Sequence, residues 1–89
     1  MATLIKTDGT VTKIDPANGK DFKLKELQGY VNGSIEIINL MNGNVLVVNE
    51  DGKLKDKPNL KATCVAMHVL RRNDYISGDV VLCKQREIL

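Results

Sequence analysis

The sequence contains no tryptophan, one phenylalanine and two tyrosines among its 89 residues. Proteins that bind single-stranded nucleic acids usually stack the bases on several aromatic side chains. The scarcity of aromatic rings therefore argues against a nucleic acid as the partner. The charges agree, because 13 Lys and Arg residues are interspersed with 11 Asp and Glu residues and form no basic face of the kind that DNA-binding domains carry.

Other absences exclude further classes of protein. No apolar run reaches the roughly 18 residues of a membrane-spanning helix, and no signal-peptide pattern is present, so we expect a cytoplasmic protein without a membrane partner. Cys64, Cys83 and the only histidine, His68, lack the spacing of a metal site. Because both cysteines lie among apolar residues, we expect buried free thiols and neither a metal nor a cofactor.

Catalytic patterns are also missing. The sequence has no Walker loop and no dinucleotide-binding glycine pattern, and neither Ser34 nor Ser77 lies in a nucleophile-elbow context. Cys64 and His68 are close enough to touch on a helix, but no third group is placed to orient the histidine. We therefore expect no enzyme, and the weakest alternative is an activity on a nucleotide through Glu50 and His68.

The N-terminal third predicts a hairpin followed by a helix. Asp8-Gly9 is a strong signal for a primed two-residue turn, which joins strands over about 3–6 and 10–14. Asp21 is a suitable N-cap for a helix over 22–31, in which apolar residues lie on or near one stripe.

The remaining sequence predicts a second hairpin, a second helix and a last strand. Asn42-Gly43 marks the turn after the strand that starts at Ile35, and the continuous apolar run of the return strand, 45–48, predicts burial on both faces. Asn59 is a natural N-cap for a helix in which mainly apolar residues recur at helical spacing. These residues are Leu60, Thr63, Cys64, Met67 and Leu70, with Ala62 and Ala66 permitting close packing. A strand over 79–85 follows.

The resulting order, ββαββαβ, predicts a single domain over residues 1–89 of the α+β class. We expect a mainly antiparallel sheet with two helices on one face.

The polar segment between the fourth strand and the second helix is a candidate binding loop. Gly52 permits a sharp turn, and Asn49, Glu50 and the lysines offer donors and acceptors suited to a ribose, a base edge or a phosphate. The alternative is that Asn49, Asp51 and Asn59 only cap the helix and form turns.

Several motifs in this region carry a family resemblance. Asn49-Glu50-x-Gly-Lys-Leu, Pro58-Asn-x-x-Ala and Ile76-x-Gly-Asp-Val resemble the pattern of a family of short domains of unknown function found in bacteriophages and mobile genetic elements. The opening LIKTDGTV also fits, so the resemblance spans almost the whole chain, and it departs from the pattern over 64–72.

The resemblance implies a phage accessory protein, and proteins of this size and origin are often anti-defence proteins. One subclass acts as sponges, which sequester second messengers of bacterial immunity without cleaving them. By this analogy we expect a homo-oligomer in the infected host cell that binds a cyclic nucleotide or an ADP-ribose derivative. The alternatives are an inhibitor or regulator that binds a host enzyme, and a structural or regulatory module.

The expected ligand-binding residues follow from this hypothesis. Asn49, Glu50, Lys53 and Asn59 contact the polar parts of the ligand, Lys55 or Arg71 neutralises phosphate, and Tyr30 or Tyr75 stacks on the base.

Overall fold

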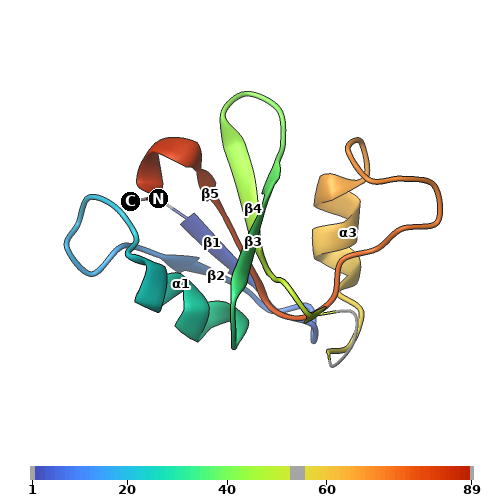
Figure 1. The fold of residues 1–89 in the computed structure, drawn as a ribbon, viewed down its shortest axis with the longest axis horizontal. Helices are drawn as coiled ribbons and strands as arrows, with labels where there is room; N and C mark the ends of the chain where they lie inside the picture. Colours follow the sequence, from blue (N-terminus) through green and yellow to red (C-terminus); the bar gives the residue numbers. More distant parts are fainter. Residues whose placement is uncertain (1, 53–55, 89) are drawn as a thin grey trace.

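The computed structural model describes residues 2–52 and 56–88. In this part of the chain, seven strands and α-helices follow one another in the predicted ββαββαβ order, with a short 3-10 helix at the end (Figure 1). Their bounds are β1 Ala2–Ile5, β2 Val11–Ile14, α1 Leu24–Val31, β3 Ile35–Asn39, β4 Asn44–Asn49, α3 Leu60–Ala66, β5 Val80–Lys84 and η1 Gln85–Glu87. The predicted α+β class is confirmed.

The described strands form one sheet in the order β2-β1-β5-β4-β3, and every neighbouring pair is antiparallel. The last strand, β5, therefore lies between the β1–β2 hairpin and the β3–β4 hairpin and joins them. This position buries the central strands on both sides. Val45, Leu46 and Val47 are fully buried, as their continuous apolar run predicted.

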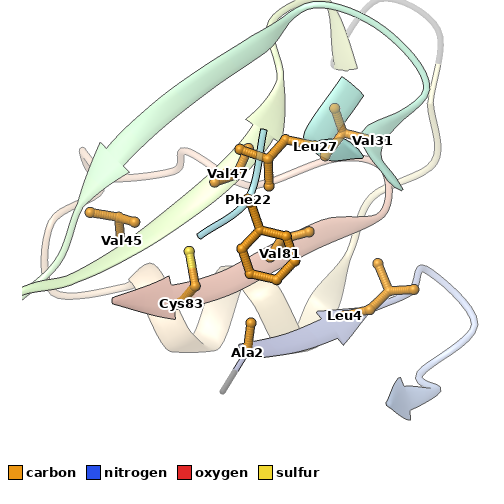
Figure 2. Packing of buried hydrophobic residues seen from close by; sticks show 9 residues of the cluster. All are labelled: Ala2, Leu4, Phe22, Leu27, Val31, Val45, Val47, Val81 and Cys83. Atoms are coloured by element: carbon orange, nitrogen blue, oxygen red, sulfur yellow. The ribbon is translucent and has the colours of Figure 1, made fainter. Parts of the chain in front are cut away.

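Helices α1 and α3 lie on opposite faces of the sheet, and not on one face as the sequence led us to expect. Alternate strand residues, such as Val45 and Val47, pack with Phe22 and the buried side of α1 (Figure 2). The residues between them, such as Leu46, pack with α3. Because β4 and β5 are apolar on both sides, each face requires its own cover.

Helix α1 begins later than predicted. Its N-cap is Lys23, whose backbone N–H donates to the Glu26 carboxylate at 3.1 Å. The prediction that Asp21 caps this helix is wrong, because Phe22 is drawn out of the helix into the core. Phe22 is fully buried, and its N–H donates to the carbonyl oxygen of Glu87 at 2.6 Å.

The two hairpins use different turns. Asn42 and Gly43 have φ values of 61° and 76°, as the primed turn requires. In the first hairpin Gly9 has a φ of 91° but Asp8 does not have a positive φ, so the expected primed turn does not form. The Asp8 carboxylate instead accepts a hydrogen bond from the Thr10 N–H at 2.8 Å.

Helix α3 packs through its small residues. Ala62 and Ala66 are fully buried, whereas Leu60 and Met67, expected on the apolar stripe, are 77% and 63% exposed. Alanines let the helix backbone approach the sheet closely, which turns the larger side chains outward. The helix ends at Ala66, one turn earlier than its apolar spacing predicted.

Candidate functional site

Asn49, the last residue of β4, is used by the fold itself. Its side chain is 5% exposed, and its Nδ2 donates to the carbonyl oxygens of Val31 at 2.9 Å and Asn32 at 3.2 Å. Its Oδ1 accepts from the Asp51 N–H at 2.7 Å. The side chain thus satisfies the C-terminal end of α1 and forms the turn after β4.

Asn59 has a similar role at the start of α3. It is 1% exposed, and its Oδ1 accepts from the Ala62 N–H at 3.0 Å, as an N-cap does. Its Nδ2 donates to the carbonyl oxygens of Ile5 at 3.0 Å and Gly78 at 2.8 Å. In both asparagines the two amide N–H groups are taken by the backbone, which is what the capping alternative described.

A cavity of about 250 Å³ lies beside the end of β4, on the α3 face of the sheet. One side is formed by the turn after Asn49, another by β3, and a third by the segment that leads from α3 to β5. The residues that line it are Glu36, Ile38, Val48, Asn49, Glu50, Asp51, Gly52, Leu70, Asp74, Tyr75, Ile76 and Ser77.

The cavity combines an apolar base with an acidic rim. Ile38, Val48 and Ile76 come from the core on the α3 face or its border. Four lining side chains are carboxylic acids, Glu36, Glu50, Asp51 and Asp74, and no described lining residue is Lys, Arg or His. Such a site favours hydrogen-bond donors and cationic groups and disfavours a buried phosphate.

The backbone approaches itself closely at one wall of the cavity. A Cβ atom at Gly52 would lie 2.9 Å from the carbonyl oxygen of Ser77, so only glycine fits at this position without a shift. Ser77 is 5% exposed, and its Oγ is buried without a hydrogen-bond partner in the described part of the chain. An unsatisfied buried hydroxyl is uncommon, so the Ser77 hydroxyl is a candidate hydrogen-bonding group for a ligand at this wall.

The structure brings some of the predicted binding residues together and separates others. Asn49, Glu50 and Tyr75 line the cavity. Tyr30 lies on the other face of the sheet, where its ring meets Phe22 edge-on at a centroid distance of 6.4 Å. Tyr30 is therefore remote from the candidate binding loop.

The cationic residues of the hypothesis are less well placed. Arg71 is exposed and follows Leu70, which lines the cavity, although Arg71 itself does not. Lys53 and Lys55 lie outside the described residues. Asn59 does not line the cavity.

Three of the polar lining residues, Glu36, Asp74 and Ser77, lie outside the loop that the sequence singled out and were not identified as site residues. Glu36 alternates with isoleucines in β3, a pattern that indicates only the wet side of a strand. Its register partner is Val48, so the pairing of β3 with β4 places it beside the end of β4. Asp74 and Ser77 precede β5 in a segment with no regular periodicity, and only the tertiary fold brings them to the cavity.

The cysteines differ from each other. Cys83 is 3% exposed, as predicted, and burial together with the nearby Glu87 charge raises its pKa to about 11. Cys64 is exposed, so the prediction of a buried thiol is wrong at that position. Its place on the outer side of α3 follows from the inward position of Ala62 and Ala66. Over residues 2–52 and 56–88, no three His, Cys, Asp or Glu side chains group as a metal site requires.

The chain belongs to the family described as Domain of unknown function (DUF3846), whose model matches residues 2–88. Comparisons with curated proteins and with solved structures found no significant match. Among the described residues, no helix has the length and apolar character needed to cross a bilayer.

Proposed function

We propose that this protein is a non-enzymatic, phage-type binding protein that sequesters a nucleotide-derived signalling molecule and leaves it intact. The observation that carries the proposal is the cavity beside β4, in which carboxylates and the Tyr75 side chain line one small space. The resemblance to phage domains supports an anti-defence role in the cytoplasm of an infected cell, with a homo-oligomer as the working form.

The lining chemistry matches the nucleoside part of such a ligand. Ribose hydroxyls and base amino groups are donors, and the carboxylates of Glu36 and Glu50 are acceptors. Acidic side chains hold the ribose in the same way in many dinucleotide-binding proteins. Tyr75 is 40% exposed and offers a ring on which a base can stack.

The same chemistry decides the orientation of the ligand. Like charges near one another repel, so the phosphates lie outside the acidic cavity and the nucleoside lies inside it. A volume of about 250 Å³ is also slightly smaller than the roughly 300–1,000 Å³ of sites that enclose a drug-sized ligand. Lys53 and Lys55, which follow Gly52 in the sequence, and Arg71, which follows Leu70, are the residues that we assign to the phosphates.

Isothermal titration of the purified full chain tests this proposal. The panel contains adenosine, AMP, ADP-ribose, cyclic ADP-ribose isomers and cyclic di- and trinucleotides, and mass spectrometry afterwards reports whether the bound compound is intact. Glu36→Gln and Glu50→Gln each weaken binding by about tenfold, because a hydrogen bond to a charged group contributes about 1.5–3 kcal/mol. Tyr75→Ala weakens it by about as much.

The matched control is Asp15→Asn, which removes an exposed carboxylate that does not line the cavity and leaves the affinity unchanged. Absence of binding across the whole panel would contradict the proposal. Affinities that Glu36→Gln and Glu50→Gln do not alter would also contradict it. A cleaved product would show that the protein is an enzyme and does not merely sequester the ligand.

A further inference from the structure

A second concave surface lies on the same face of the sheet, on the side of β1 and β2. It is a groove of about 440 Å³ between these strands and α3. Its strand side includes Ile5, Val11 and Leu82, and its helix side includes Leu60, Cys64 and Val65. Val11 is 52% and Leu60 is 77% exposed, so the groove is open and apolar.

The groove continues to a free strand edge. β2 is the outermost strand and pairs with β1 alone among the described strands (Figure 1). The Lys6 N–H donates to the carbonyl oxygen of Thr10 at 2.9 Å. Because hydrogen-bonded and non-bonded pairs alternate in an antiparallel ladder, the backbone groups of Val11 and Lys13 point away from β1. They are available to a further strand.

The side chains at this edge determine which side chains a further strand needs in order to bind here. Val11 pairs with Ile5 and Lys13 pairs with Thr3, so both side chains project on the α3 face, next to the groove. Lys61 is the only charged residue among the described residues that line the groove. Its Nζ donates to the carbonyl oxygen of Gly9 at 2.7 Å, which leaves two of its three N–H donors. The rim of the groove is therefore positive.

We propose that β2 and the groove together bind an extended segment of a partner protein, which adds to the sheet as a sixth strand. Its backbone pairs with Val11 and Lys13, an apolar side chain opposite Val11 enters the groove, and an acidic side chain two positions away meets Lys13. Peptide addition to a sheet edge beside a helix is a common mode of recognition, in which the main chain supplies affinity and alternate side chains supply specificity.

The charges favour such a partner over the other possible occupants. A second copy that paired through β2 would bring two Lys13 ammonium groups into one interface, and like charges across strands are destabilising. A lipid chain would fill the apolar groove but would leave the outward backbone groups of β2 without partners. An extended peptide with one apolar and one acidic side chain fills the groove, pairs with the outward backbone groups of β2 and neutralises Lys13.

The experiment is an NMR titration of the ¹⁵N-labelled full chain with a capped peptide, Thr-Val-Thr-Glu-Thr. We expect shifts of the Val11, Lys13 and Cys64 amides, and slower hydrogen exchange at the outward β2 amides. The control peptide Thr-Val-Thr-Lys-Thr replaces the acidic side chain by a cationic one and binds at least about tenfold more weakly. The amides of β3, the other edge strand, serve as an internal control and do not shift.

Three variants separate the contributions. Leu60→Asp places a charge in the groove at an exposed position and weakens binding by about tenfold, with the fold intact. Lys13→Pro removes one outward N–H without touching the bonds to β1 and abolishes the β2 shifts. Lys13→Gln removes the charge alone and weakens binding by about threefold.

Several results would overturn the inference. One is the absence of shifts at millimolar peptide, and another is binding that survives both Leu60→Asp and Lys13→Pro. Shifts at β2 that depend on protein concentration without peptide would assign the edge to a second copy. Shifts at Cys64 and Leu82 with dodecanoate, in the absence of any response to the peptide, would assign the groove to an apolar small molecule.

Discussion

The side chain of Asn59 donates a hydrogen bond to the carbonyl oxygen of Ile5 at 3.0 Å, across 54 positions of sequence. A second bond from the same Nδ2 reaches the carbonyl oxygen of Gly78 at 2.8 Å. One buried amide thus ties the start of α3 to the end of β1 and to the turn before β5. A residue whose chemistry would suit ligand contact is instead occupied in holding three segments together.

The first prediction separates this role from simple helix capping. Asn59→Ala removes the N-cap and one hydrogen bond from each of two buried carbonyl oxygens, so the free energy of unfolding falls by about 2–3 kcal/mol. Asn59→Asp keeps a good N-cap acceptor but sets a carboxylate against two carbonyl oxygens, and we expect at least as large a loss at pH 7.

Urea denaturation monitored by circular dichroism measures both variants. Asn39→Ala, at an exposed position of β3, is the control and changes the free energy of unfolding by less than about 0.5 kcal/mol. If Asn59→Asp is as stable as the parent protein, the residue is only a cap.

A second prediction uses two glycines of opposite character. Gly52→Ala forces a methyl group against the Ser77 carbonyl oxygen, at 2.9 Å in the unchanged backbone, and destabilises by about 1–3 kcal/mol. Gly29 lies within α1, and a methyl group added to it would have no atom within 4 Å beyond the backbone of its own helix and its chain neighbours. Gly29→Ala therefore stabilises by about 0.5–1 kcal/mol.

The two thermal melting temperatures should move in opposite directions. Because both substitutions add the same methyl group, the comparison removes any general effect of alanine. An unchanged melting temperature for Gly52→Ala would mean that the backbone at this wall of the cavity shifts at little cost. The close approach of Gly52 to Ser77 would then not contribute to stability.

Local signals predicted much of the fold. The Asn42-Gly43 turn, the continuous apolar run of β4 and the Asn59 cap each depend on a few neighbouring residues, and all three are confirmed. The start of α1 was not predictable in this way. It depends on Phe22, which leaves the helix to bond with Glu87, 65 positions away in the sequence.

The candidate site depends even more on long-range contacts. Glu50 is recognisable because it follows a strong strand signal, but Glu36 and Ser77 reach the same cavity from separate elements. Their convergence requires knowledge of strand order and of which face carries α3. The buried side of α3 was mispredicted for a related reason. The large apolar residues of the helix suggested which side faces the sheet, but Ala62 and Ala66 occupy the buried side.

A third prediction concerns the reactivity of the two thiols. Cys64 is exposed and Cys83 is 3% exposed with a pKa of about 11. Since the thiolate is the reactive form, we expect one rapidly modified thiol per chain with Ellman's reagent at pH 8, and two in guanidinium chloride. Cys64→Ser removes the rapid phase and Cys83→Ser does not, and two rapid phases in the native parent would contradict the burial of Cys83.

The last prediction is a loss of stability at alkaline pH that is caused by ionisation of the Cys83 thiol. Burial, with the nearby Glu87 charge, raises the pKa of this thiol from 9.0 to about 11. The unfolded chain therefore releases the proton at lower pH than the folded chain does. The stability linked to this group is complete below about pH 9, and it falls between about pH 9 and pH 11 as the unfolded thiol ionises first.

The slope of this loss is at most about 1.4 kcal/mol per pH unit for one proton. Lysines and tyrosines titrate in the same range, so the informative quantity is the difference between the parent protein and Cys83→Ala, measured by urea denaturation at several pH values. Cys83→Ala is less stable at pH 7 because it leaves a small void, but its stability declines less steeply above pH 9. Parallel declines in the two proteins would show that Cys83 ionises as easily in the folded chain as in the unfolded chain.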